Sequence, residues 1–303
     1  MTSEMRLISK AGKTFYFATF WLSQSVRLDA ARAYNFCRLV DDIADATPAR
    51  PDRDAYLSCV TTAILEEDDS HELINPILPL LTRFPEIRHP LAALVEACRQ
   101  DVSSLHIQNE RELESYAHGV AGNVGLIMYP ILGGTSDLGL SYAADLGIAM
   151  QYTNIARDIM EDLTRKRIYL PTSWLSGRTL RDTYEINPQN EPIMVEAIRR
   201  LLFLADARYS RGLSGLNYLA PENRFAIRVA AQCYRAIGDR VIKNSTIARQ
   251  RSVVSNLRKI GIACKAAIHH RTERKASLLE RKPHTHHILA HTESDLRHKT
   301  GVS

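Results

Sequence analysis

The stretch CRLVDDIAD, residues 37–45, places polar and apolar side chains on opposite sides of a helix. Each residue turns an α-helix by about 100°, so residues three or four positions apart share a side. By this geometry the polar side spans roughly 60° and holds Tyr34, Arg38, Asp41 and Asp45, with Asp42 at its edge. Leu39 and Ile43 lie opposite and can pack. The stretch predicts a core helix that carries a stripe of carboxylates.

A second stretch of the same kind, QYTNIARDIMED, occupies residues 151–162. Its polar stripe spans roughly 80° and holds Gln151, Asn154, Asp158 and Asp162, flanked by Arg157 and Glu161. Ile155 and Ile159 supply the apolar part of the same helix. One such stripe alone is more often a solvated helix face than a functional site. Two of them, each with an arginine, predict a shared functional site.

Carboxylates one helical turn apart repel each other, and a bound cation relieves the repulsion. Mg²⁺ prefers hard oxygen ligands and completes its shell with water and phosphate oxygens. We therefore predict a Mg²⁺ site, with Mn²⁺ as a substitute, whose ligands are Asp41, Asp42, Asp45, Asp158 and Asp162. The same repulsion predicts that Asp41→Asn or Asp158→Asn leaves stability level or raises it.

The rest of the chain predicts helices and no strands. Gly and Pro are sparse, with 14 and 12 among 303 residues, so long helices can form without a breaker. Helical patterns cover residues 14–47, 54–67, 91–106, 116–132, 141–164, 191–219 and 222–244. We predict one all-α domain over residues 1–248. A basic, His-rich tail with a composition typical of disorder follows over 249–303.

The composition argues against several classes of protein. Five cysteines without CxxC spacing disfavour a disulfide framework or a zinc site and fit a reducing cytoplasm. No apolar run reaches the roughly 18 residues of a transmembrane helix. Seven of the 11 histidines lie beyond residue 268, with irregular spacing that disfavours a metal site. The net charge of +5 gathers in the tail, which is typical of a solvated segment and can attract a membrane surface or nucleic acid. As partners we expect a membrane surface and no nucleic acid.

The two aspartate stripes resemble those of the squalene and phytoene synthase family. The matching strings are Tyr34-Asn-Phe-Cys37-Arg38-x-x-Asp41-Asp42-Ile-x-Asp45 and Asp145-Leu-Gly147-x-Ala-x-Gln151-x-Thr-Asn154-Ile-Ala-Arg157-Asp158-x-x-Glu161-Asp162. Two shorter strings are Arg167-x-Tyr169-Leu-Pro171 and Val120-Ala-Gly122-x-Val-Gly125. The motifs keep their order and spacing from about residue 10 to 245, so the resemblance covers most of the chain.

The resemblance implies a single-domain isoprenoid synthase helical bundle, with the two stripes facing a central active-site cavity. It implies head-to-head condensation of two prenyl diphosphates. The expected reaction is geranylgeranyl diphosphate to phytoene through a cyclopropylcarbinyl diphosphate, in carotenoid biosynthesis and without NADPH. The catalytic residues it implies are Asp41, Asp45, Asp158 and Asp162. The substrate-binding residues it implies are Tyr34, Arg38, Gln151, Asn154, Arg157 and Arg167.

Two positions depart from the family pattern, because His118 and Thr246 stand where the family has tyrosines. One alternative is a squalene or dehydrosqualene synthase that uses farnesyl diphosphate. Another is a catalytically dead family member that acts as an assembly factor, although such proteins are expected to lose the aspartates. The resemblance implies a cytoplasmic protein, peripheral on the inner face of the membrane, with downstream carotenoid enzymes as partners.

Overall fold

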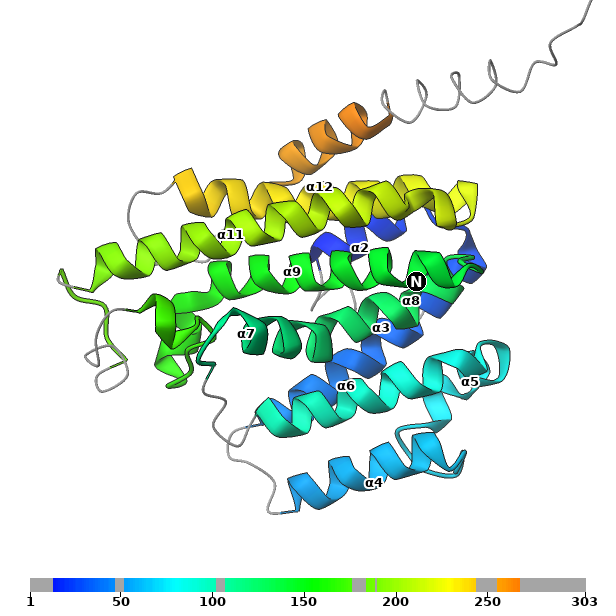
Figure 1. Ribbon diagram of the computed structural model, residues 1–303. Coiled ribbons are helices and arrows are strands. Elements are labelled where there is room, and N and C mark those ends of the chain that lie inside the picture. Colours follow the sequence, from blue (N-terminus) through cyan, green and yellow to red (C-terminus); the bar gives the residue numbers. More distant parts are fainter. Residues whose placement is uncertain are drawn as a thin grey trace, which may run out of the picture.

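The computed structural model describes residues 13–46, 52–101, 107–175, 184–188, 190–243 and 255–267 (Figure 1). Every regular element within these ranges is a helix, which confirms the predicted all-α fold. No helix in these ranges is both long enough and apolar enough to cross a membrane.

The first half of the bundle contains one long helix and several shorter ones. Its α-helices are α2 (Lys13–Thr19), α3 (Gln24–Asp45), α4 (Arg53–Leu65), α5 (Leu78–Arg83) and α6 (Arg88–Asp101), with the 3₁₀ turns η1 (Asn75–Ile77) and η2 (Pro85–Ile87). Helix α3 begins where the Ser23 hydroxyl accepts a hydrogen bond from the Val26 amide, as an N-cap serine does. It ends at Asp45, so the first aspartate stripe occupies its last two turns.

The second half holds the longest helix. Its helices are α7 (Glu110–Ala117), the π-helical turn η3 (His118–Gly122), α8 (Asn123–Ile131), α9 (Asp137–Thr164), η4 (Thr172–Trp174), α11 (Glu191–Ser214), η5 (Gly215–Tyr218) and α12 (Pro221–Lys243). Helices α9, α11 and α12 lie side by side in Figure 1, and α4 forms the opposite edge with α6. Helix α9 is therefore central, and its last four turns carry the second stripe.

Two glycines set how closely α9 approaches α8 and the turn η3 before it. A Cβ atom on Gly125 of α8 would lie 2.1 Å from the carbonyl oxygen of Ala143, and one on Gly147 of α9 would lie 2.0 Å from that of Ala121 in η3. No real side chain fits at those distances, so α9 touches both segments backbone to backbone. These contacts hold α9 in one position relative to η3 and α8.

An ion-pair cluster joins α9 to α11. The Asp145 carboxylate is 2% exposed and accepts hydrogen bonds from Arg208 and Arg211. Arg208 also contacts Glu114 of α7 at 2.5 Å. A buried charge is tolerated when it is paired and hydrogen-bonded. Asp145 is therefore explained as part of the scaffold behind the second stripe.

The predicted tail is described only at residues 255–267. Residues 256–267 form a helix, which we call the tail helix. It packs against α12 and α2 through Ala263 and Ala266. The boundary at residue 248 stays a prediction.

Candidate active site

A cavity of about 300 Å³ runs through the bundle. Helix α9 lines it at every third or fourth residue, with Gly139, Tyr142, Ala143, Leu146, Gly147, Met150, Gln151 and Asn154. Six of the predicted site residues line it, namely Tyr34, Arg38, Asp41, Asp45, Gln151 and Asn154. Toward the other end of α9 the wall includes Leu22, Leu132, Leu216 and Leu219. The cavity therefore has one polar end and one apolar end.

The stripe on α3 lies at the protein surface. Arg38 contacts Asp41 at 2.9 Å and Asp42 at 2.6 Å, both within the same helix. The two aspartate side chains are 46% and 55% exposed. Asp41 lines the cavity, whereas Asp42 is not part of its wall. Exposed pairs of this kind are worth at most about 1 kcal/mol, so they can open for a ligand.

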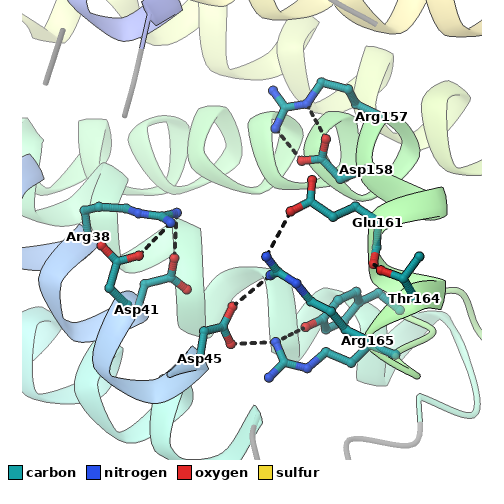
Figure 2. A network of polar contacts seen from close by, with 11 residues as sticks. Arg38, Asp41, Asp45, Arg157, Asp158, Glu161, Thr164 and Arg165 are labelled. Atoms are coloured by element: carbon teal, nitrogen blue, oxygen red, sulfur yellow. Dashed lines mark hydrogen bonds and ion pairs between the residues drawn. The ribbon is translucent and has the colours of Figure 1, made fainter. Parts of the chain in front are cut away.

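Asp45 connects the two halves of the site. Its carboxylate lies 2.5 Å from Nη1 of Arg167 and 3.4 Å from Nη1 of Arg165. Arg165 also contacts Glu161 of α9 at 2.9 Å, which Figure 2 shows as a bridge between the helices. The sequence prediction included Arg167 but missed Arg165. The basic run at residues 165–167, directly after the second stripe, was the available signal.

The stripe on α9 is much less exposed. Arg157 holds Asp158 through two hydrogen bonds of 2.7 and 2.5 Å, and the side chains are only 14% and 17% exposed. Burial, with the neighbouring carboxylates of Asp158 and Glu161, raises the pKa of Asp162 to about 7. These carboxylates are crowded, and an added positive charge would relieve them.

Two amides of α9 and a tyrosine of α3 line the same cavity. The Asn154 side-chain oxygen is buried, and no hydrogen-bond partner for it is found among the described residues. Its amide nitrogen lies 3.4 Å from Oε1 of Gln151. Burial raises the pKa of Tyr34, whose ring stacks on Phe15 at 4.9 Å. Asn154 thus presents an oxygen that a ligand can satisfy, and Tyr34 presents a neutral hydroxyl.

These groups offer the oxygen ligands that Mg²⁺ prefers, but their side chains do not form a complete binding site. Within the described ranges, no three His, Cys, Asp or Glu side chains converge closely enough to hold a metal ion. The donors are hard oxygens, and the raised pKa of Asp162 and the unsatisfied oxygen of Asn154 both favour a cation. Mg²⁺ needs only one or two carboxylates when phosphate and water supply the rest.

Some predicted residues do not reach the cavity wall. Arg157, Asp158 and Asp162 lie on the turns of α9 that follow Asn154, and Arg167 lies just beyond that helix. His118 is exposed and is not part of the wall either. Thr246 lies outside the described residues.

Tyr116 and Tyr234 line the cavity although neither was predicted as a site residue. Nothing in the local sequence distinguishes them from core tyrosines. Only the packing of α7 and α12 around the cavity identifies them.

Comparison with known proteins gives concordant matches. A family model described as squalene/phytoene synthase matches residues 8–258. A 15-cis-phytoene synthase of Paracoccus sp. (strain N81106 / MBIC 01143) is 32% identical, over 84% of this chain and 86% of that protein. A bifunctional lycopene cyclase/phytoene synthase of Gibberella fujikuroi (strain CBS 195.34 / IMI 58289 / NRRL A-6831) is 30% identical, over 88% of this chain and 52% of that protein, so the chain spans about half of it.

A solved structure shares the fold. It is the crystal structure of a dehydrosqualene synthase in complex with ligand, with a TM-score of 0.77. The alignment covers 89% of this chain and 95% of that one, at 24% sequence identity.

Proposed function

The chain belongs to the squalene and phytoene synthase family, and from this premise we propose that it condenses two molecules of geranylgeranyl diphosphate head to head to form phytoene. The relatives at about 30% identity carry phytoene synthase in their names. The reaction would make the protein a prenyltransferase of carotenoid biosynthesis. The observation that carries the proposal is a single cavity with a charged end and an apolar end.

The charged end suits a diphosphate. Arg38 lines it, and Arg165 and Arg167 meet Asp45 beside it. Guanidinium groups form charge-assisted, often bidentate, hydrogen bonds with phosphate oxygens. The ion pairs that now occupy these arginines would exchange for the diphosphate. The arginines then stabilise the negative charge that develops as the carbon–oxygen bond breaks.

We further propose that Asp41, Asp45, Asp158 and Asp162 hold Mg²⁺ with the substrate, and that Asp42 supports them from the exposed edge of the stripe. Bound Mg²⁺ would supply positive charge for the leaving diphosphate. Asn154, whose side-chain oxygen is buried, would add a neutral oxygen donor. Gln151 and Tyr34 line the wall next to it and would orient the substrate.

The apolar end suits a long prenyl chain. The apolar part of the α9 stripe that lines the cavity runs from Gly139 to Met150, or about 17 Å at the helical rise of 1.5 Å per residue. Three backbone bonds of an extended chain span about 3.5 Å, so three isoprene units of four bonds each span about 14 Å and four units span about 19 Å. A wall of this length accommodates most of a prenyl chain of either size, and its apolar lining keeps water from the reacting carbons.

Product analysis tests the proposal. The full-length protein is incubated with geranylgeranyl or farnesyl diphosphate and Mg²⁺, with and without NADPH, and the products are identified. We expect phytoene from geranylgeranyl diphosphate, independent of NADPH and abolished by EDTA. Squalene or dehydrosqualene from farnesyl diphosphate would support the alternative. If neither substrate gives a product, the result would support the alternative that the protein is a catalytically dead assembly factor.

The hydrophobic substrate and product also support peripheral contact of the protein with the cytoplasmic face of a membrane. There the product would reach the downstream carotenoid enzymes. Prenyl chains of this length reside in the lipid phase, so an enzyme at its surface receives them without a passage through water.

A further inference from the structure

The tail helix has one side packed and one side exposed. Its packed side includes Ala263 and Ala266, which touch Val229 and Cys233 of α12. On its outer side Leu257 is 83% exposed and Ile260 is 52% exposed. Residues three positions apart lie on the same side of a helix, so these two side chains form one apolar stripe.

The turn after α2 exposes two further apolar side chains. Phe20 is 54% exposed and Trp21 is 36% exposed. Trp21 packs edge-on against Phe17, with ring centroids 5.1 Å apart. Nζ of Lys259 in the tail helix lies 5.8 Å from the centre of the Phe17 ring, so the two elements touch. We call Phe20, Trp21, Leu257 and Ile260 the outer patch.

Positive charge borders the outer patch. Arg258 and Lys265 are exposed on the tail helix, and residues 255–267 contain no acidic residue. Arg258 lies 3.9 Å from Asp239, a contact of the kind that contributes little at a surface. A helix with an apolar stripe beside exposed cations is typical of segments that lie in the interface of a lipid bilayer.

We propose that the outer patch docks on the surface of an anionic membrane. The apolar side chains would enter the boundary of the acyl chains, and Arg258 and Lys265 would meet anionic headgroups. Each basic residue near such a surface contributes about 1 kcal/mol of attraction. The combination of exposed aliphatic side chains with exposed cations on one helix favours a lipid surface over a protein partner.

The position of α2 connects the docking surface with the cavity. Its Phe15, Ala18 and Thr19 line the cavity, whereas Phe17 faces the tail helix from the other side. One short helix thus separates the cavity from the outer patch. Resting on the proposed function, we infer that prenyl chains pass between cavity and bilayer along α2.

Vesicle flotation without substrate tests the docking surface. The full chain is mixed with vesicles of phosphatidylcholine, with or without phosphatidylglycerol, and the bound fraction is measured. We expect binding to the anionic vesicles, and a decrease of at least about tenfold in the variant Leu257→Ser/Ile260→Ser. The variant Arg258→Gln/Lys265→Gln should lose about fivefold per residue on anionic vesicles. The matched control is Phe203→Ser, because Phe203 is 75% exposed on α11, outside the patch.

Three results would overturn the proposal. The first is equal binding by wild type and Leu257→Ser/Ile260→Ser with an unchanged thermal melt. The second is binding that ignores lipid charge. The third is a concentration-dependent dimer, lost in Leu257→Ser/Ile260→Ser, with no vesicle binding, which would make the patch an interface between copies. Turnover in detergent is measured separately, so an enzyme that is inactive yet binds vesicles would refute the proposed function and not the surface.

Discussion

The two aspartate stripes have the same spacing and very different surroundings. On α3, Asp41 and Asp42 are about half exposed, at 46% and 55%, and both contact Arg38. On α9, Asp158 is 17% exposed and is held by Arg157, which is 14% exposed. Water screens the first stripe, whereas the second relies on fixed charges. The spacing of a motif therefore fixes which atoms face a ligand. Burial fixes the free-energy cost of keeping each of those charges in the folded protein.

Substitutions in either stripe should have the same effect on turnover. If both hold the substrate through Mg²⁺, Asp41→Asn and Asp158→Asn should each lower kcat by about 10²–10³. Steady-state kinetics with geranylgeranyl diphosphate measures this. Glu196→Gln, an exposed carboxylate on α11, is the control and should keep wild-type turnover. Near-normal turnover in either aspartate variant would remove that stripe from the site.

Stability should separate the two stripes. Asp158→Asn leaves the half-buried Arg157 without its charged partner, so the free energy of unfolding should fall by about 1–3 kcal/mol. Asp41→Asn changes a half-exposed side chain and should stay within about 0.5 kcal/mol of wild type. Urea unfolding without metal compares them. Helical spacing predicted equal or higher stability for both, and the structure changes that expectation for Asp158.

The pH dependence of stability should come from the second stripe. In the unfolded chain Asp162 titrates near 3.8, whereas in the fold its pKa is about 7. Between these values the folded state holds a proton that the unfolded state has lost, so stability falls as pH rises. Metal-free protein should lose on the order of 4 kcal/mol between pH 4 and 8 through this group.

Asp162→Asn provides the check on that assignment. Thermal melts from pH 4 to pH 8 should be flatter in this variant than in wild type. Added Mg²⁺ should stabilise wild type more at pH 8 than at pH 5, because the ligand carboxylates are then deprotonated. An unchanged pH profile in Asp162→Asn would assign the effect to another group.

The bridge between the stripes should contribute least. Arg165 is 51% exposed and joins Asp45 to Glu161. Arg165→Gln should change the free energy of unfolding by less than about 1 kcal/mol, and less at high salt. A double-mutant cycle with Glu161→Gln measures the coupling. A coupling above about 2 kcal/mol would mean that the bridge is a structural lock and not an exchangeable contact.

The sequence alone determined the helical class, both stripes and the family. Periodicity of 3.6 residues is a local property, so residues 37–45 and 151–162 could be placed on helix faces without any knowledge of their neighbours. The same reasoning predicted one helix over 116–132, whereas a π-helical turn at His118–Gly122 divides it. A turn of that kind depends on how neighbouring helices pack, which local propensity does not encode.

Only the tertiary structure decided which charges are buried and which residues meet. Arg167 reaches Asp45 across 122 positions of the chain, and Tyr116 and Tyr234 reach one cavity from separate helices. Contacts of that range depend on where whole helices lie, and no local pattern fixes that. The same holds for α2, whose two sides face the cavity and the tail helix. Spacing thus determined which functional groups this chain can present together. Packing determined how deeply each group is buried and which partners it contacts, and these set its pKa and its contribution to stability.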